Sequence, residues 1–261
     1  MPRAHYVSCG YYTAAAAGTG VAVPMAGDTF NVPNFNDGAG YLENFWAEGA
    51  STDFVSIKSP RMHDNNQGMR MQVSTNFVNP LLPWGAYQAL TSGDTPTVSI
   101  DETAAATGAI AAIYSFDDLP GVQPRLDTWA DVAARIVAIS GVQVNLGAVG
   151  AIGAYSAGAA INSTYDNFQS DADYALLGWL TSASVLAIAV SGQDTGNLKV
   201  GGPGIADPKV TRNFFVEMDQ RTGRASIPLI AANNKGGTLV FQTDHAAQAA
   251  QNVTLIMAEL K

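Results

Sequence analysis

The stretches Tyr41-Leu-Glu-Asn-Phe-Trp46 and Tyr174-Ala-Leu-Leu-Gly-Trp179 decide the fold of this chain. In each, a tyrosine stands five residues before a tryptophan, and both residues recur after 133 positions (174 minus 41 and 179 minus 46). An apolar run follows each stretch at the same offset, Phe54–Ile57 in the first copy and Ala187–Val190 in the second. We therefore expect a duplicated β unit, with Tyr41, Trp46, Tyr174 and Trp179 as the structural anchors of the repeat.

The repeat extends outward from these anchors with small changes of offset, as insertions in surface loops would produce. Identities between the copies are few, so a single large β domain with coincidental spacing is the alternative interpretation. Three further pairs of segments align: Ser8–Gly10 with Ile139–Gly141, Met69–Met71 with Asn197–Lys199, and Asp101–Phe116 with Asp244–Glu259.

Short runs of β-branched and aromatic residues alternate with turn signals such as Ser92-Gly93-Asp94 and Arg221-Thr222-Gly223. Such punctuation is typical of strands joined by tight turns. Val185–Val190 and Ile110–Phe116 alternate with a period of two, which places successive side chains on opposite faces of a sheet. The sequence therefore predicts an all-β protein built as a sandwich or barrel.

Helical signals are scarce. Thr128 is a candidate N-cap for a short helix over Trp129–Ile136. Pro80–Leu90 is a weaker helical candidate, because Pro83 and Gly85 interrupt it. Leu119–Pro124, with two prolines and a glycine, is the best linker. We expect a first domain at 1–120, a linker at 121–130 and a second domain at 131–261.

The composition limits the possible functions of the 261 residues. Only 13% are charged, well below the roughly 25% of an ordinary soluble domain. Surfaces covered by neighbouring copies would explain this, because the cores of interfaces are depleted in charge. The net charge of −9 argues against direct nucleic-acid binding. The one cysteine, Cys9, excludes an intrachain disulfide and is expected to be a small buried apolar residue.

The sequence offers no pattern for a metal or a cofactor. His5, His63 and His245 are too far apart in sequence to form a metal-binding pair, so a double cupin is not expected. The glycine cluster at 201–204 lacks the lysine of a phosphate-binding loop. The acidic pairs Asp117-Asp118 and Asp171-Ala-Asp173 are expected to be solvated turns rather than calcium ligands.

Ala154-Tyr155-Ser156-Ala157-Gly158 is the strongest enzymatic signal, because it resembles the nucleophile elbow of α/β-hydrolases. His245 lies downstream, and Asp194, Asp207 and Asp219 lie between, in the order such a triad requires. The first 150 residues do not alternate strand and helix as that fold demands. A serine hydrolase using Ser156 therefore stays a minor alternative, and we expect no enzymatic activity.

Tandem β units, low charge and the absence of a catalytic cluster together resemble the double jelly-roll major capsid proteins of icosahedral viruses and tailless phages. The resemblance covers nearly the whole chain and rests on organisation rather than on a diagnostic motif. It implies an all-β fold of two tandem jelly-roll β-sandwiches with one or two short helices. In that family, three chains form a pseudo-hexagonal capsomer.

The resemblance also implies a location and partners. The chain would be a bacteriophage or viral structural protein of the virion, assembled in the host cytoplasm as a homotrimer. Its partners would be other copies in a lattice of capsomers, minor capsid or vertex proteins, and an internal membrane. The alternative is a β-sandwich receptor- or sugar-binding protein of a virion or cell surface. For that alternative, an aromatic set could line the sugar site: Tyr11, Tyr12, Phe45, Trp46, Trp84, Phe214 and Phe215.

Overall fold

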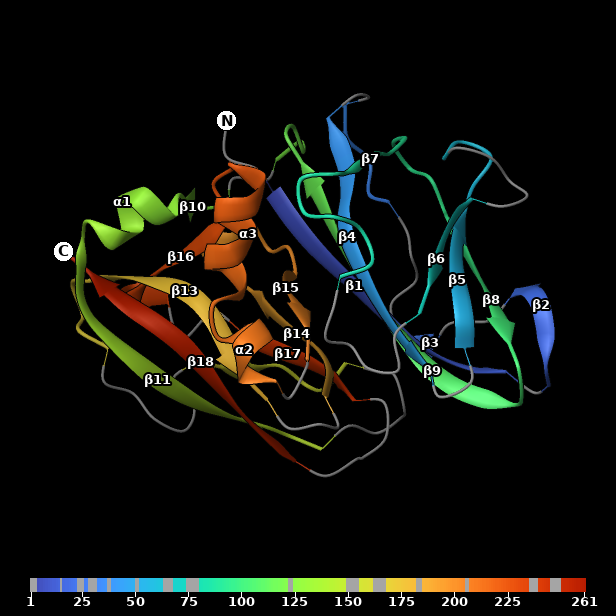
Figure 1. Ribbon diagram of the computed structural model, residues 1–261. Coiled ribbons are helices and arrows are strands. Elements are labelled where there is room, and N and C mark those ends of the chain that lie inside the picture. Colours follow the sequence, from blue (N-terminus) through green and yellow to red (C-terminus); the bar gives the residue numbers. More distant parts are fainter. Residues whose placement is uncertain are drawn as a thin grey trace.

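A computed structural model describes most of the chain as antiparallel β-sheet (Figure 1). The expectation of an all-β protein is confirmed. Its described residues form four sheets and three short α-helices. They are residues 4–14, 16–22, 26–27, 32–36, 39–49, 52–62, 68–73, 80–121, 124–148, 155–161, 168–181, 185–204, 207–234, 239–244 and 250–261.

The first half of the chain, here the strands up to Phe116, forms two of these sheets. One has the order β3-β1-β9-β4-β7 and the other has the order β2-β8-β5-β6. The longest ladder joins β1 and β9, which pair without a break from Ala4↔Phe116 to Ala14↔Ala106. The strands are β1 (Ala4–Ala14), β2 (Gly18–Ala22), β3 (Ala26–Gly27), β4 (Gly40–Gly49), β5 (Thr52–Lys58), β6 (Met69–Gln72), β7 (Gln88–Ala89), β8 (Thr97–Glu102) and β9 (Ala106–Phe116).

The second half, from Leu126 onward, forms the other two sheets. Their orders are β10-β16-β13-β18-β11 and β12-β17-β14-β15. The strands are β10 (Leu126–Asp127), β11 (Ile136–Leu146), β12 (Ala159–Ala160), β13 (Asp173–Leu180), β14 (Val185–Ser191), β15 (Val200–Pro203), β16 (Ile227–Ala231), β17 (Leu239–Asp244) and β18 (Gln251–Leu260). The helices are α1 (Trp129–Ala133), α2 (Pro208–Thr211) and α3 (Phe214–Thr222), with 3-10 turns at Gln193–Thr195 and Ala232–Asn234.

The two halves repeat one strand order. If the short edge strands β3 and β10 are set aside, each described half has eight strands. When the eight strands of a half are numbered 1 to 8 along the chain, one sheet has the strand order 1-8-3-6 and the other has the order 2-7-4-5. This holds for both halves. The two stretches quoted at the outset lie on β4 and β13, the third strand of each half.

Two apolar cores follow from this arrangement. One lies between the two sheets of the first half and includes Leu42, Phe45, Ile57 and Tyr114, all fully buried. Burying each such side chain contributes about 1.5–3 kcal/mol. Because side chains alternate along a strand, the residues between them on β1, β4 and β9 face away from this core.

Those outward-facing residues belong to the second core. Val7, Cys9 and Ala111 pack with the side chains of the second half rather than with their own. β1 and β9 both contact β14 and β15. The four sheets are therefore stacked as successive layers, with the five-stranded sheet of the first half lying against the four-stranded sheet of the second (Figure 1).

The helices differ in part from the sequence prediction. Thr128 caps α1 as predicted, since its Oγ1 accepts a hydrogen bond from the Asp131 amide (3.2 Å), although the helix ends at Ala133. The prediction of a helix at Pro80–Leu90 is wrong. That segment consists of turns and β7, Gly85 has a left-handed φ of 82°, and the Leu82 backbone is paired by the Asn44 side chain.

None of the described helices has the length and apolar character needed to span a membrane.

Candidate functional site at the junction of the two halves

Five aromatic rings meet where the two halves touch, and we call them the aromatic junction. Phe214, the first residue of α3, is at the centre. Its ring centroid lies 5.7 Å from Trp46 on β4, 6.4 Å from Trp84 in the segment before β7, and 4.8 Å from Trp179 on β13. Phe215 packs edge-on against both Phe214 and Trp179. The junction therefore joins four segments distant in sequence into one apolar cluster.

The two anchor tryptophans reach this junction from different faces of their sheets. Trp46 pairs with Ala111 on the outward face of β9, whereas Trp179 pairs with Leu255 on the core side of β18. The Trp179 Nε1 donates a hydrogen bond to the Pro203 carbonyl (3.2 Å). The Trp46 Nε1 is buried and has no acceptor among the described residues. The two tryptophans therefore lie on corresponding strands of the two halves, β4 and β13, but on opposite faces of their sheets.

A β-bulge explains the spacing of the anchors. In a regular strand, a tyrosine and a tryptophan that stand five positions apart would lie on opposite faces of the sheet, because side chains alternate between the faces. The ladder of β4 shifts between Leu42 and Asn44, and that of β13 shifts between Leu176 and Gly178. Because a bulge adds one residue, it brings the tyrosine and the tryptophan of each strand to the same face.

The two anchor tyrosines have different surroundings. Tyr174 is buried, stacks on Phe168 with centroids 4.1 Å apart, and accepts a hydrogen bond from the Gln169 amide (2.7 Å). Tyr41 is partly exposed and meets Tyr87 edge to face at 4.9 Å. Neither tyrosine is part of the aromatic junction.

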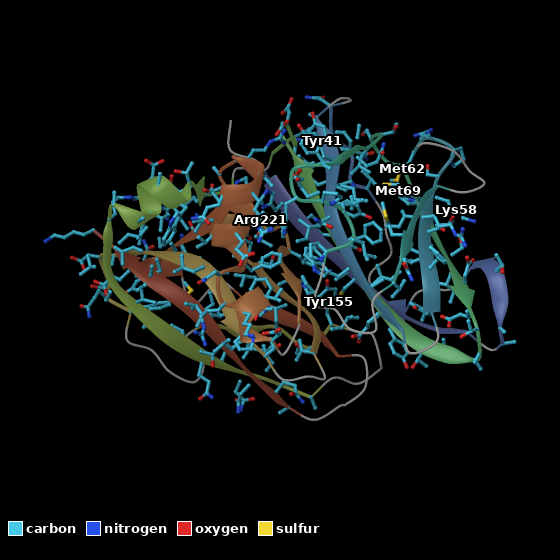
Figure 2. The ribbon with its side chains drawn as sticks, viewed as in Figure 1. Tyr41, Lys58, Met62, Met69, Tyr155 and Arg221 are labelled. Atoms are coloured by element: carbon cyan, nitrogen blue, oxygen red, sulfur yellow. The ribbon has the colours of Figure 1, made fainter. Side chains whose placement is uncertain are left out.

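A groove of about 840 Å³ lies over the aromatic junction. Pro80–Trp84 forms one wall, and residues of α2 and α3 form the other. Lys209, Glu217 and Arg221 supply its charged groups, and Arg221 pairs with Glu217 at 3.3 Å along the helix. Arg221 is labelled on α3 in Figure 2.

A polar cluster lies at the same interface. The Ser115 Oγ donates a hydrogen bond to Glu43 Oε1 (2.6 Å), and the Arg224 guanidinium lies 4.0 Å from the same carboxylate. Arg224 also donates to the Tyr87 hydroxyl (2.8 Å). His5 pairs with Ser115 across the ladder, is only 3% exposed, and has no described partner at Nδ1. Burial lowers its pKa to about 4.

The first strand is also tied to the second half directly. The Val7 amide donates to the Lys199 carbonyl (2.7 Å), and the Cys9 Sγ lies 3.0 Å from the Tyr155 hydroxyl. The Lys199 ammonium lies 4.0 Å from the centre of the Tyr155 ring, which is labelled in Figure 2. Cys9 is fully buried, as predicted.

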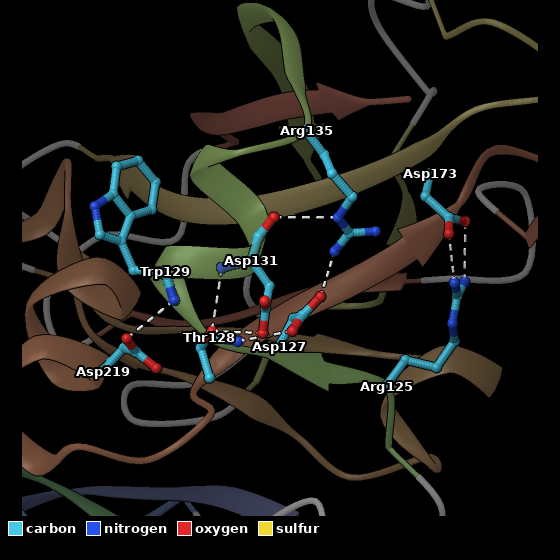
Figure 3. Close-up of polar contacts among 8 residues, drawn as sticks. All are labelled: Arg125, Asp127, Thr128, Trp129, Asp131, Arg135, Asp173 and Asp219. Carbon is cyan, nitrogen blue, oxygen red and sulfur yellow. Dashed lines mark hydrogen bonds and ion pairs between the residues drawn. The ribbon is translucent and has the colours of Figure 1, made fainter.

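The acidic residues singled out in the sequence serve structure. Asp173 holds Arg125 through two hydrogen bonds of 2.6 and 3.1 Å, and Asp219 accepts from the Trp129 amide at 3.0 Å (Figure 3). Asp127 is ion-paired with Arg135. These contacts tie residues 125–129, the last part of the predicted linker, to the second half. Within the described ranges, no three His, Cys, Asp or Glu side chains gather as a metal site.

The Ser156 segment lacks the geometry of a nucleophile elbow. Such a serine occupies a sharp turn from strand to helix, whereas residues 156–158 lead into β12 and Ser156 is buried. Asp194 accepts hydrogen bonds from the Ala231 amide (2.9 Å) and Asn234 (3.0 Å), and Asp207 caps α2. His245 lies outside the described residues. No catalytic arrangement around Ser156 is therefore assembled in the described part of the chain.

Two solved structures are similar to this chain over nearly its whole length. No family model and no curated protein matches the chain. The crystal structure of the STIV MCP has a TM-score of 0.23 and 8% identity over 98% of this chain and 96% of that one. The major capsid protein P2 from bacteriophage PM2 has a TM-score of 0.19 and 11% identity over 97% and 98%. Both TM-scores are too low to carry an argument about fold or function.

Proposed function

We propose that this chain is a non-enzymatic major capsid protein with a double jelly-roll fold, which assembles as pseudo-hexameric trimers into an icosahedral shell. The two domains are residues 1–120 and 131–261, joined by 121–130. The repeated order of eight strands in two sheets supports this fold, because a jelly roll is an eight-stranded double sheet. Its place is the virion, assembled in the host cytoplasm.

The observation that carries the proposal is the way the two halves stack. The outer face of β1 and β9 packs on β14 and β15, so two different kinds of face meet. At the junction, the outer face of a five-stranded sheet meets the outer face of a four-stranded sheet. The stack of four sheets leaves one outer face of each kind free, one at each end. These ends are the β2-β8-β5-β6 sheet and the β10-β16-β13-β18-β11 sheet. Copies that join head to tail through such faces form a heterologous contact, which closes into a ring when the rotation permits.

The end face of the second half has the chemistry of a subunit contact. Val137 and Ile139 on β11 are 57% and 59% exposed, the largest exposures among the large apolar side chains described. Ile256 on β18 is partly exposed beside them, opposite Gly141. Apolar groups grouped in this way mark interaction surfaces.

The opposite end face is more polar and offers a complementary surface. On β5 the Phe54 ring is covered by the Arg70 guanidinium at 4.1 Å, and Arg70 pairs with Asp101 of β8. Aromatic residues and arginine are both enriched at protein–protein interfaces. In the assembled shell, the partners are further copies, minor capsid or vertex proteins and an internal membrane. The net charge of −9 disfavours direct contact with the genome.

The native mass tests the proposal. Light scattering after size-exclusion chromatography should give a trimer near three times 27.2 kDa, about 82 kDa. The double variant Val137→Asp/Ile139→Asp should shift the protein toward the monomer without loss of its folded circular dichroism spectrum. The control Ala104→Asp, in the exposed turn between β8 and β9, should leave the trimer unchanged. A wild-type protein that remains a monomer at high concentration contradicts the proposal.

A further inference from the structure

We infer that the groove over the aromatic junction binds an acidic sugar, such as a uronic or sialic acid residue of a glycan. This goes beyond the shell role and does not depend on it, because the groove is formed entirely within one chain. Its volume of about 840 Å³ lies within the range of small-ligand pockets.

The first observation is a rigid aromatic platform. Trp84 is partly exposed, and its ring is fixed edge-on against Trp46 (6.0 Å, 65°) and Phe214 (6.4 Å, 67°). The exposed Pro83 extends the same wall. A flat, amphipathic ring held in one orientation suits the apolar C–H face of a sugar at little cost in conformational entropy.

The second observation is a buried ring beneath the groove. Trp46 lines the groove and is 1% exposed, and its Nε1 is buried. A ligand resting in the groove therefore does not reach this N–H, and the base of the groove offers it an apolar surface. The polar contacts of a bound sugar must then come from the charged side chains of α2 and α3.

The third observation is positive charge in an acidic protein. Lys209 and Arg221 both line the groove, and one carboxylate, Glu217, pairs with Arg221. The groove therefore has a surplus cation although the whole chain has a net charge of −9. A ligand carboxylate would complete this set, while Glu217 can accept hydrogen bonds from sugar hydroxyls. This charge is what favours an acidic over a neutral sugar.

A titration monitored by tryptophan fluorescence tests the inference on the purified, full-length protein. N-acetylneuraminic acid and glucuronic acid should change the emission in a saturable way, and galactose should bind at least about tenfold more weakly because it lacks the carboxylate. Lys209→Glu should weaken binding of the acids by about tenfold and leave galactose unaffected. Trp84→Ala should weaken binding of all three sugars. The control Lys58→Glu, on β5 and away from the groove, should bind like the wild type.

Three results would overturn the inference: equal affinity for acidic and neutral sugars, unchanged binding by Lys209→Glu, or no saturable response to either acid. A short polyglutamate peptide that binds more tightly than both acids would also refute it and show that the groove takes an acidic peptide. The native mass is measured separately, so failure of sugar binding and failure of trimer formation are distinguishable.

Discussion

Acidification should loosen the junction between the two halves through His5. This imidazole is buried at the interface, and burial lowers its pKa to about 4 from the ordinary 6.5. Between these values the unfolded chain binds a proton that the folded chain does not, so stability falls as the pH falls through this window. The difference between a pKa of 6.5 in the unfolded chain and about 4 in the folded chain corresponds to about 3 kcal/mol of folding stability. About 2 kcal/mol of this stability is lost when the pH falls to 5.

Other titrating groups act in the opposite direction. Burial raises the pKa of Asp117 and of Asp219, and a raised carboxyl pKa adds stability as the pH falls. The effect of His5 must therefore be isolated by difference. His5→Gln keeps a polar side chain of similar length but cannot be protonated, so the pH dependence that it lacks is the part due to His5.

Urea unfolding of the wild type and of His5→Gln at pH 7 and pH 5 measures this difference. Between pH 7 and pH 5, the free energy of unfolding of the wild type should fall by about 2 kcal/mol more than that of His5→Gln. This difference does not depend on how stable the variant is at pH 7. An NMR titration of the His5 ring gives its pKa directly. Equal losses in both proteins, or a His5 pKa near 6.5, would refute the reasoning.

Two further substitutions test the packing of the junction and of the second half. Phe214→Ala should lower the free energy of unfolding by about 3–5 kcal/mol, because it removes the ring that contacts all three tryptophans of the junction. Urea unfolding measures this loss, and a loss below about 1 kcal/mol would show that the packing of the halves does not depend on Phe214. Gly201→Ala should prevent folding or destabilise the protein severely, because the new Cβ would lie 1.8 Å from the Ile188 carbonyl oxygen. The control Gly147→Ala adds a Cβ in open space, and its thermal unfolding should occur at the wild-type temperature.

The strands were predictable because their signal is local. Val185–Val190 and Ile110–Phe116 alternate with a period of two, and both are strands. Thr128 was predictable as a cap for the same reason. Pro80–Leu90 failed as a helix because its backbone is paired by Asn44, which is far away in sequence.

Two helices were missed although the sequence carries their signals. Asp207 followed by Pro208 is an N-cap with proline at the first helical position, and Gly223 ends α3 in the left-handed region. Phe214, Phe215, Met218 and Asp219 recur at the spacing of one buried helical face. The aromatic junction itself could not be predicted, since its rings come from β4, the segment before β7, β13 and α3, and only the fold brings these together.

The outer faces of the two five-stranded sheets differ in chemistry, and this difference bears on how firmly each face is held. On the first half's five-stranded sheet, the outward residues Val7, Cys9 and Ala111 are apolar and fully buried by the second half. On the corresponding face of the second half, Gln143 and Asn145 follow the exposed Ile139 along β11. Polar interfaces retain water and dissociate more readily than apolar ones of the same area. If copies meet through this face as proposed, the two halves form a permanent unit and the contacts between copies remain reversible, so misjoined copies can separate and rejoin during assembly.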